Sequence, residues 1–526
     1  MLNFAFLAYV CYIQSMKKYL LVAVNAKFIH FNPAVYSIRA YAKRDNPDSD
    51  IEVSCYTINQ DIGKIVESIY NETPDVIGFS CYIWNISIVK ECVKTIKKIM
   101  PNVEIWLGGP EVSYNTEEVL EELPIRGIMI GEGEETFSEI VKTYDELSHE
   151  PCDNAFADVC GLALRKFKTD ERKPINLDML PFFYETLSDE EMENHILYYE
   201  SSRGCPYSCT YCLSSIDKTL RFKSIDKVYK ELDFFLDRKV RQVKFVDRTF
   251  NCRREHAMAI WQYIKDHDNG VTNFHFEIAS ETLSDDEIEL LCSLRSGLIR
   301  LEIGVQTTNE DTLKRINRRM DLNRLKDVSR RLIDAGNIHL HLDLIAGLPE
   351  EGMESFINSF NEIYSLHADE LQLGFLKVLK GTMIEKEADK GEIVYDSKPP
   401  YEVLKTNVLD YKDLRKLKAV EEMLEIYYNS GQFVKSVAYL EKCFDTPFEL
   451  YEALAKHYSD RGYDIIQPSR IKRYDILLEF YEMLKEDGII EMKECLLYDL
   501  YEREELKKVP DWAGDLADKY RRKRTK

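Results

Sequence analysis

Three cysteines, Cys205, Cys209 and Cys212, are the residues in this sequence with the clearest chemical potential. Gly204 and Pro206 surround the first of them and favour a loop. One loop with spacings of four and three residues can surround a compact metal centre with three thiolates. Iron–sulfur clusters usually have four cysteine ligands. The nearest other cysteines in the sequence, Cys160 and Cys252, are separated from these three by about forty positions or more. A cubane held by only three thiolates leaves one iron open to an exogenous ligand.

Three other interpretations of the cysteine group stay open. Three inert, buried thiols would not need to cluster beside glycine and proline in a loop. A zinc site would need two cysteine pairs or a nearby histidine, and the nearest downstream histidine is His256. A closed electron-transfer cluster could be completed by Cys252. The spacing favours the open iron–sulfur cluster over these three.

The cysteine group follows an apolar run that begins a second series of alternating strand and helix patterns. Six strand–helix units predict a partial (β/α)6 barrel, whose active site would open at the carboxyl ends of the strands. The predicted strands of this series are residues 197–201, 243–246, 274–278, 299–305, 339–345 and 370–375.

An earlier series of apolar runs predicts a doubly wound parallel sheet with helices on both faces. Its predicted strands are residues 19–24, 51–57, 76–82, 103–107 and 127–130. Ligands on such sheets bind at the carboxyl ends of the strands. The residues that begin these loops, and that we expect at a binding site, are Asn25, Ser80, Gly108, Gly109, Gly131 and Gly133.

The expected fold class is α/β, with four segments along the chain. Residues 16–145 form the Rossmann-type sheet, and residues 146–195 form a connector of weak periodicity. Residues 196–385 form the barrel, and residues 386–526 form a mostly α-helical extension.

The C-x3-C-x2-C spacing, with Tyr211 before the last cysteine, resembles the radical S-adenosylmethionine (SAM) superfamily. The resemblance implies that Cys205, Cys209 and Cys212 bind a 4Fe–4S cluster and that SAM chelates the open iron. One electron from the reduced cluster would cleave the sulfonium bond and give a 5′-deoxyadenosyl radical. That radical would abstract hydrogen from an unactivated C–H bond, while the barrel orients the reactants and excludes water.

Further motifs of that family can be carried over to single residues of this chain. Tyr211 is expected beside the adenine, and Gln306, in Leu301–Gln306, at the SAM ribose. The motif 343–349 begins with Asp343, which resembles a ribose-binding aspartate. Arg318 resembles the arginine that pairs with the SAM carboxylate, a task that suits a planar guanidinium. Glu277 matches a SAM-binding position in relatives such as the oxygen-independent coproporphyrinogen oxidases.

One segment departs from the radical SAM pattern. Residues 246–250 read Val-Asp-Arg-Thr-Phe, where many members carry a Gly-Gly-Glu segment that supports the SAM amino group. Similar Asp-x-x-Phe segments occur in the cobalamin-associated branch.

The first sheet resembles the cobalamin-binding domain that precedes many radical SAM barrels. The resemblance rests on the motifs Asp75–Ser80, Leu107–Glu111 and Ile130–Phe137, whose small residues let a bulky cofactor approach the backbone. Domains that supply a lower axial histidine use D-x-H-x-x-G, but Lys27 stands at that position and His30 is only a nearby loop residue. We therefore expect cobalamin without a histidine ligand, or a sheet that has lost cobalamin.

The C-terminal third resembles an uncharacterised extension of one bacterial subgroup of cobalamin-type radical SAM proteins, and it brings no known substrate. The prediction is a radical SAM enzyme, cobalamin-dependent, with methyl transfer from methylcobalamin as the leading outcome and rearrangement or ring formation next. Its partners would be a small-molecule or peptide substrate and a reductant such as flavodoxin or ferredoxin. The alternatives are a radical SAM enzyme without cobalamin and a non-catalytic iron–sulfur electron-transfer protein.

Composition restricts the partners and the compartment. Asp plus Glu is 92 against 70 Lys plus Arg, a formal charge of −22, which argues against general binding to nucleic acid or anionic lipid. No window reaches the roughly 18–20 apolar residues of a membrane span. Thirteen cysteines without a secretory signal predict a reducing cytoplasm, where clustered cysteines bind metal more often than they form disulfides. Met16 is the expected functional start, because Met16-Lys17-Lys18 leads directly into the first strand.

Overall fold

The computed structural model describes residues 17–147, 151–388, 390–503 and 510–517. The chain forms two compact units. The first runs to Glu277 and includes Lys377–Lys386 and Asp396–Glu402. The second comprises Ile278–Leu376, Glu387–Tyr395 and the chain from Val403 onward. The expected start at Met16 lies outside the described residues.

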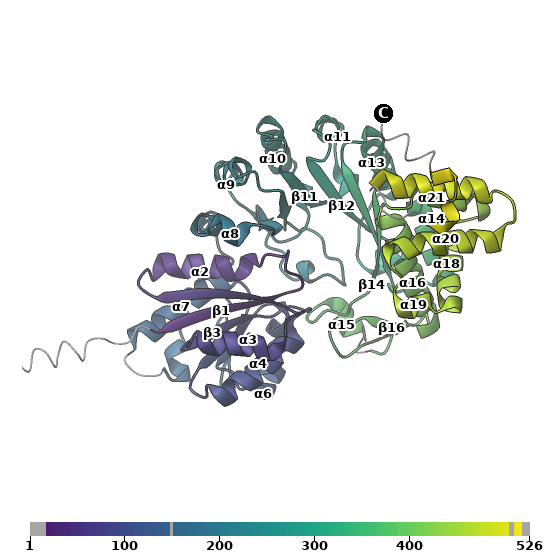
Figure 1. Ribbon diagram of the computed structural model, residues 1–526. Helices are drawn as coiled ribbons and strands as arrows, with labels where there is room; N and C mark the ends of the chain where they lie inside the picture. The colour runs from purple at the N-terminus through teal and green to yellow at the C-terminus, as the bar shows by residue number, and fades with distance from the viewer. Residues whose placement is uncertain (1–16, 148–150, 389, 504–509, 518–526) are drawn as a thin grey trace, which may run out of the picture. The chain divides into compact units, whose positions relative to one another are not determined.

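The first unit opens with a six-stranded sheet of order β2-β1-β3-β4-β5-β6 (Figure 1). Its strands are β1 (Lys18–Asn25), β2 (Asp50–Thr57), β3 (Val76–Ser80), β4 (Glu104–Gly108), β5 (Gly127–Met129) and β6 (Leu162–Leu164). The first five pair in parallel. Strand β1 is buried along nearly its whole length, as its continuous apolar sequence predicts for a sheet covered on both faces.

Helices cover both faces of this sheet. Helices α2 (Pro33–Asp45) and α7 (Gly133–Glu146) pack together on the face that carries Tyr19, whose ring meets Phe137 edge-on. The opposite face forms an apolar core with α3 (Ile62–Asn71), α4 (Ile86–Ile99), and the short α5 (Pro110–Ser113) and α6 (Thr116–Glu122). Helix α2 begins as its sequence indicates, with Asn32 capping the backbone N–H of Ala34 and Pro33 in the first turn.

The stretch expected to be a mere connector contributes to the sheet. Strand β6, at Leu162–Leu164, pairs antiparallel with β5. The sheet is therefore mixed, with one antiparallel edge strand on five parallel strands. The remaining described part of this stretch has 3-10 turns, Asp153–Phe156, Leu177–Met179 and Phe183–Thr186, and the one-turn helix α8 (Asp189–Met192).

The second strand–helix series begins in the first unit. Strand β10 (Gln242–Phe245) pairs in parallel with β7 (Leu197–Tyr199) and with β11 (Asn273–Ile278). Helix α9 (Ile225–Asp237) precedes β10, and α10 (Arg254–Asp266) follows it. Two short antiparallel strands, β8 (Ser202–Arg203) and β9 (Arg221–Phe222), flank the loop with the three cysteines.

The series continues in the second unit, where β13 (His339–Ala346) pairs in parallel with β12 (Ile299–Gln306) and β14 (Glu370–Phe375). The six predicted strands of this series are thus all present. The intervening helices are α11 (Asp285–Cys292), α12 (Glu310–Arg315), α13 (Leu322–Ala335) and α14 (Met353–Tyr364). Side chains alternate strictly between buried and half-buried along β12 and β13, so each strand directs a polar set to one face.

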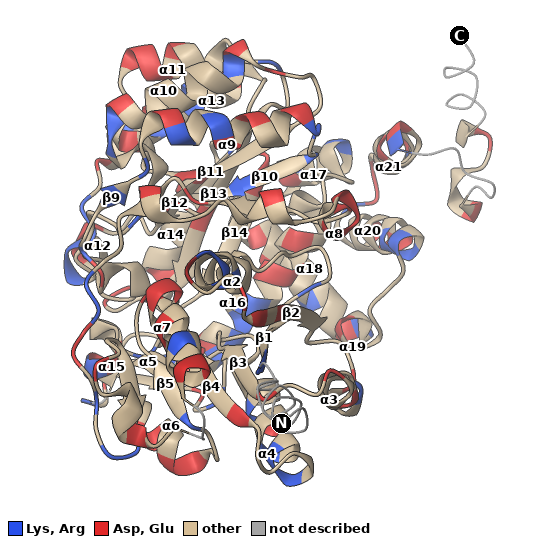
Figure 2. Cartoon of the chain, turned by 90° about the vertical axis from the view of Figure 1, so that its left-hand side faces the viewer, with Lys and Arg blue, Asp and Glu red and all other residues tan. Residues whose placement is uncertain are grey.

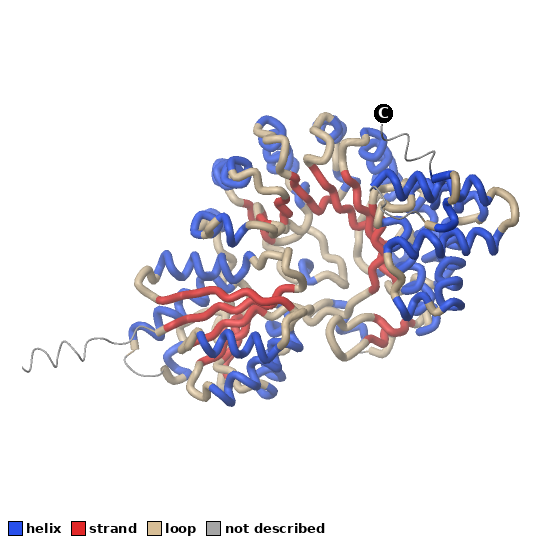
Figure 3. Tube along the Cα trace, in the orientation of Figure 1, coloured by secondary structure: helices blue, strands red, loops and turns tan. Residues whose placement is uncertain are grey.

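The C-terminal part of the second unit is mostly helical, as predicted (Figure 3). It also contains an unpredicted antiparallel hairpin of β15 (Ile393–Tyr395) and β16 (Val403–Thr406). Helix α15 (Met383–Ala388) precedes this hairpin. The helices that follow are α16 (Tyr411–Leu424), α17 (Val434–Leu440), α18 (Pro447–Arg461), α19 (Tyr463–Ile466), α20 (Arg470–Leu484) and α21 (Ile489–Arg503).

Charged residues of both signs occur together on the helices of the second unit (Figure 2). Asp285 on α11, for example, forms ion pairs with Arg324 and Arg331 on α13, at 3.4 Å and 2.6 Å. Within the part of the chain that the structure describes, no helix combines the length and the apolarity that crossing a membrane requires.

Candidate active site

The base of the cysteine loop is closed by the β8–β9 pair, in which Ser202 faces Phe222 and Arg203 faces Arg221. Gly204 follows β8 with a φ of +94°, and a Cβ atom there would lie 2.6 Å from the carbonyl oxygen of Thr219. Only glycine fits this close approach of the two backbones. The sequence signal at Gly204 thus has a local structural cause, because glycine lets the loop close immediately before Cys205.

The three thiols belong to one loop and are mostly buried. Cys205 and Cys209 are 8% and 5% exposed, and Cys212 is half-buried. The N–H of Cys212 donates to the carbonyl of Cys209 at 3.2 Å, and the Sγ of Cys205 lies 3.6 Å from the Oγ1 of Thr249. Among the described residues, no three His, Cys, Asp or Glu side chains converge on the position of a single metal ion. The fit to a cluster with three protein ligands therefore rests on the chemistry and spacing of three thiols within eight residues of one closed loop, and not on side chains that already converge.

Cys252, the possible fourth ligand, follows β10 in a 3-10 turn at Phe250–Cys252. Burial raises the pKa of its thiol to about 11, and the charges of Asp247 and Cys205 contribute in the same direction. Cys252 therefore lies in the electrostatic neighbourhood of Cys205.

Asp247 ties the strand end after β10 to the start of the cysteine loop. Its carboxylate accepts hydrogen bonds from the N–H of Ser201 at 3.0 Å, the hydroxyl of Ser201 at 2.6 Å and the hydroxyl of Ser202 at 2.5 Å. Burial raises the pKa of Asp247 to about 6, although these hydrogen bonds oppose the rise. The nearby Nε2 of His256 lies 3.2 Å from the hydroxyl oxygen of Ser201. Asp247, which stands in the segment that departs from Gly-Gly-Glu, thus positions the cysteine loop.

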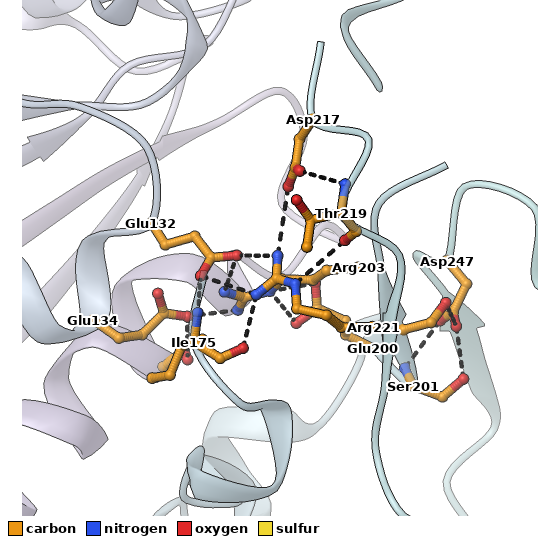
Figure 4. A network of polar contacts seen from close by, with 12 residues as sticks. Glu132, Glu134, Ile175, Glu200, Ser201, Arg203, Asp217, Thr219, Arg221 and Asp247 are labelled. Atoms are coloured by element: carbon orange, nitrogen blue, oxygen red, sulfur yellow. Dashed lines mark hydrogen bonds and ion pairs between the residues drawn. The ribbon is translucent and has the colours of Figure 1, made fainter. Parts of the chain in front are cut away.

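A second network joins the cysteine loop to the loop between β5 and α7 (Figure 4). Arg203, two residues before Cys205, contacts Glu134 at 2.5 Å, Glu132 at 3.4 Å and Glu200 at 2.9 Å. Arg221 on β9 donates to Glu132 at 2.6 Å. Burial would raise the pKa of Glu132, but Arg221 and Arg203 outweigh that effect and hold it below its usual value. Residues 131–134, Gly-Glu-Gly-Glu within the motif Ile130–Phe137, therefore contribute two carboxylates that hold the base of the cysteine loop.

A cavity of about 790 Å³ opens between the first sheet and the elements around β7. Five of the six residues predicted from the first sheet line it: Ser80, Gly108, Gly109, Gly131 and Gly133. Asn25 is buried at the end of β1 and is not among the lining residues. The volume lies in the upper part of the range for small-molecule and cofactor pockets, about 300–1,000 Å³.

The glycines of this cavity serve different purposes. At Gly109, with a φ of +112°, a Cβ would lie 2.5 Å from the carbonyl oxygen of Cys81, so glycine is required for backbone packing. At Gly131, with a φ of +78°, a Cβ would meet no atom within 4 Å. The open side of Gly131 therefore leaves room for a bulky ligand, and this cradle of small residues fits a corrinoid.

No histidine occurs among the described residues that line the cavity. The Nδ1 of His30 lies 2.7 Å from the hydroxyl of Tyr198, so this histidine is engaged elsewhere, and Lys27 is exposed. Aromatic side chains from the loop after β3 lie at the cavity instead. Tyr82 lines it and stacks on Trp84, with ring centroids 4.5 Å apart.

A strap formed by Lys377–Lys386 and Asp396–Glu402 packs within the first unit. The hydroxyl of Tyr401 donates to the buried carboxylate of Glu111 at 2.8 Å. At Gly381 a Cβ would lie 2.5 Å from the ring of Tyr114, which lines the cavity. The N–H of Ile384 donates to the carbonyl of Thr210, inside the cysteine loop, at 3.0 Å. The strap thus contacts both the first sheet domain and the cysteine loop.

The residues predicted to bind SAM are divided between the two units. Tyr211 is half-buried in the cysteine loop, and Glu277 on β11 lies 3.8 Å from the Nζ of Lys244. Gln306, Arg318 and Asp343 belong to the second unit.

Within the second unit, Gln306 ends β12 with a φ of +72°, a strained value for a residue with a side chain. The Nη2 of Arg318 donates to the carbonyl of Gly304, and a Cβ at Gly304 would collide with the amide of Gln306. Gly304 thus makes room for the side chain of Gln306. The buried Oε1 of Gln306 accepts no hydrogen bond from the described residues, which suits an atom that receives a ligand.

Asp343, on β13, lies 3.0 Å from the Nε2 of His341, two residues earlier on the same face of the strand. Burial would lower the pKa of His341, but the hydrogen bond to Asp343 and the carboxylates of Glu302 and Glu370 outweigh burial and raise it. Glu370 lies 2.9 Å from His339 and 3.6 Å from His341. Histidines and carboxylates in mutual contact therefore accompany Asp343 on this face of the strands.

Several residues at these sites escaped the sequence analysis. Arg203 and Arg221 stand on either side of the cysteine motif, but the sequence contains no direct signal for their contacts. The position of Arg203 next to Gly204 and Cys205 was the one available hint. The carboxylates Glu132 and Glu134 were part of a recognised motif, but their partners are 89 and 69 residues away in the chain.

Family models match three parts of the chain. A B12 binding domain matches residues 19–141, and the radical SAM superfamily matches residues 199–363. A family described as a protein of unknown function (DUF4080) matches residues 389–526.

Curated relatives resemble the first two of these parts. The cobalamin-dependent radical SAM methyltransferase TokK of Streptomyces tokunonensis is 27% identical over 318 residues, which cover 54% of this chain and 44% of that protein. The anaerobic magnesium-protoporphyrin IX monomethyl ester cyclase of Rubrivivax gelatinosus is 23% identical, over 61% of this chain and 60% of its own length. The match thus spans less than half of TokK and well under two thirds of the cyclase.

Solved structures share the fold. The cobalamin-dependent SAM radical enzyme OxsB, with aqua-cobalamin and SAM bound, superposes with a TM-score of 0.63 at 16% identity, over 97% of this chain and 84% of that one. The radical SAM methyltransferase TsrM from Kitasatospora setae, with cobalamin and a 4Fe–4S cluster bound, gives 0.58 at 14% identity, over 73% and 78%. The chain thus contains, in order along the sequence, a region that matches a B12 binding domain, a region that matches the radical SAM superfamily and a region that matches DUF4080.

Proposed function

We propose that this protein is a radical SAM enzyme that uses cobalamin and acts on an unactivated C–H bond. Cys205, Cys209 and Cys212 hold a 4Fe–4S cluster, and SAM occupies the iron that the polypeptide leaves open. When bound, the cluster supplies the electron that cleaves SAM, and cobalamin supplies a transferable methyl group. Methyl transfer is the leading reaction, and rearrangement or ring formation of the substrate is the next.

One observation is the main support for this proposal. The cavity of about 790 Å³ is lined both by Ser80, Gly108 and Gly131 of the first sheet and by Arg203, next to the cysteine loop. The ion pair between Arg203 and Glu134 fixes that loop to the first turn of α7. A large cavity next to the proposed cluster ligands, within one compact unit, supports a corrinoid site there.

The proposed SAM contacts follow from the family resemblance and from local geometry. Arg318 offers a planar guanidinium for the SAM carboxylate, and Asp343 offers a carboxylate for the ribose hydroxyls. The buried, unsatisfied Oε1 of Gln306 supports a role as a hydrogen-bond acceptor for SAM. Tyr211 and Glu277 complete the proposed set. Nearby, the Nε2 of His341 lies 3.0 Å from the Oδ1 of Asp343, a contact that supports a fixed position of this carboxylate.

The substrate is proposed to be a small molecule or a peptide, with flavodoxin or ferredoxin as the electron donor. A reducing cytoplasm suits both the oxygen-sensitive cluster and the many free thiols of the chain. A radical SAM enzyme without cobalamin is the second candidate, and the departure of Lys27 from the histidine motif favours it.

The test of the proposal is anaerobic reconstitution with iron and sulfide, followed by SAM and a reductant. We expect 5′-deoxyadenosine as a product and, after loading, the visible spectrum of bound cobalamin. A protein that forms 5′-deoxyadenosine but retains no cobalamin would support the second candidate. A protein that forms no 5′-deoxyadenosine would contradict radical SAM chemistry.

A further inference from the structure

Four cationic side chains line the cavity of the first unit: Arg172, Arg203, Lys223 and Arg248. Three of them are neutralised by carboxylates. Arg172 pairs with Glu135 and Glu139, and Arg203 pairs with Glu132, Glu134 and Glu200. Lys223 lies 2.7 Å from Glu231, and both are buried. These three cations are part of the protein's internal charge balance and have little capacity for a ligand.

Arg248 differs from the other three. Among the described residues, its guanidinium has neither an ion pair nor a hydrogen bond, although it lines the same cavity. Six carboxylate residues also line the cavity, but none of them lies within 4 Å of Arg248, the limit for an ion pair. The six are Glu132, Glu134, Asp170, Glu171, Glu200 and Asp217. An uncompensated guanidinium in a ligand-sized cavity attracts an anion.

The backbone at Arg248 is held on both sides. The preceding residue, Asp247, accepts three hydrogen bonds from Ser201 and Ser202. The following residue, Thr249, donates its hydroxyl to the carbonyl of Arg248 at 2.8 Å and lies 3.6 Å from the thiol of Cys205. Arg248 therefore has an exposed side chain on a fixed backbone, next to a proposed cluster ligand.

An aromatic surface accompanies the free guanidinium. Burial raises the pKa of Tyr82, and the positive charge of Arg248 opposes that rise, so the two side chains are electrostatic neighbours. Both line the cavity. A guanidinium beside an aromatic ring can bind the charged end of a molecule while the ring contacts its apolar part.

We propose that Arg248 recognises an anionic group, a carboxylate or a phosphate, on the substrate of this enzyme. The inference rests on the proposed function for the identity of that molecule as a substrate. The guanidinium fork binds either oxyanion in a bidentate manner. The substrate class is thus an organic acid or a phosphate ester that enters the cavity between the first sheet and the cysteine loop.

The test measures the reactivity of single arginines toward phenylglyoxal, which attacks free guanidinium groups, by peptide mass mapping of the anaerobic, reconstituted protein. Arg248 reacts faster than Arg203 and Arg172, whose guanidinium groups are occupied by carboxylates. Inorganic phosphate is the probe of the oxyanion site. With a Kd of about 1 mM, 10 mM phosphate leaves roughly one tenth of the sites free and slows modification of Arg248 about tenfold.

Two controls keep the measurement specific. Arg330 on α13 is an exposed arginine outside the cavity, and its modification rate does not change with phosphate. In the Arg248→Gln variant, phosphate protects no other arginine. Equal reactivity of Arg248 and Arg203, or no protection of Arg248 by phosphate, would overturn the assignment of an oxyanion site.

Further arms separate the possible sources of the anion. The substrate assignment requires that phosphate still protects Arg248 in protein loaded with both SAM and cobalamin. Full protection by SAM alone assigns the site to the SAM carboxylate, and full protection by cobalamin alone assigns it to the nucleotide phosphate of the corrinoid. Either result overturns the substrate assignment. A protein that forms no 5′-deoxyadenosine would instead refute the proposed function. The protection experiment does not depend on that assay, because it measures arginine modification and not product formation.

Discussion

Arg203 donates to Glu134 at 2.5 Å, and this ion pair connects the residue before Gly204 and Cys205 to the first turn of α7. The Glu134 side chain is 6% exposed and that of Arg203 is 17% exposed. The hydroxyl of Ser37, on α2, also donates to Glu134 at 3.1 Å. Glu134 is therefore a structural residue of the interface between the first sheet domain and the cysteine loop, although it stands in a motif that suggested cofactor contact.

Replacement of Glu134 by glutamine will weaken this interface, because Arg203 then keeps only Glu132 and Glu200. Loss of a charged hydrogen bond at a buried site lowers the free energy of unfolding by about 2 kcal/mol. The matched control is Glu139→Gln, which removes one carboxylate from Arg172 at a half-exposed position and costs less than about 1 kcal/mol. Anaerobic urea denaturation measures both. Equal losses in the two variants would contradict the role of Glu134.

Asp247 gives the protein a specific pH dependence. Its pKa of about 6 in the folded protein lies above the value of an unfolded aspartate, about 3.9. The folded state therefore binds the proton more tightly, and the stability from this group is present at low pH and is lost as the pH rises through about 6. Between pH 5 and pH 8 the loss amounts to about 1.4 kcal/mol.

The measurement for Asp247 compares urea denaturation of the wild-type protein and the Asp247→Asn variant at pH 5 and pH 8. The difference in unfolding free energy between the two proteins should change by about this 1.4 kcal/mol, with the wild type relatively more stable at pH 5. A difference that is constant with pH would show that Asp247 is ionised throughout this range.

Gly131 tests the position of the cobalamin site. Gly131 and Gly270 have similar φ values, +78° and +75°, and a Cβ at either position would meet no atom within 4 Å. Substitution by alanine therefore costs about 1 kcal/mol of backbone strain at each. Only Gly131 lines the cavity. Gly131→Ala should weaken cobalamin binding by about tenfold, or 1.4 kcal/mol, while Gly270→Ala should leave it unchanged, as measured by titration of the visible spectrum. Equal affinity of both variants would place cobalamin elsewhere.

Much of the fold was predictable because its strands are continuous apolar runs, such as β1 at Lys18–Asn25, that leave little ambiguity about burial. The sequence did not predict strand β6, because three residues are too few to show the hydrophobic alternation of a strand. Its position in the sheet depends on pairing with β5. The hairpin of β15 and β16 was missed for the same reason. Short edge elements are stabilised by tertiary pairing more than by their own sequence.

The site was predictable only where one local motif contains the whole signal. The loop glycines at Gly131 and Gly133 were expected at the cavity and line it. Asn25 was expected there because it ends β1, but it lies buried. The partners of Arg203 are separated from it by up to 71 positions, and Arg248 is distinguished by the carboxylates it lacks. Both the contacts of Arg203 and the lack of a carboxylate beside Arg248 depend on the folded chain, so local sequence does not reveal them.

The central claim is that three cysteines, and no fourth residue, bind the cluster so that one iron remains available to SAM. The alternative ligand is Cys252, whose thiol lies in the electrostatic neighbourhood of Cys205. The Cys252→Ala variant should therefore keep the iron content of the wild type, whereas Cys212→Ala should lose cluster iron. Circular dichroism of both variants checks that each is folded.

The most direct measurement is the formation of 5′-deoxyadenosine from SAM by these reconstituted proteins under a reductant. The account predicts the product in the wild type and in Cys252→Ala, and none in Cys212→Ala. Loss of cluster iron in Cys252→Ala, together with no 5′-deoxyadenosine from the wild type, would contradict it and identify a closed electron-transfer cluster.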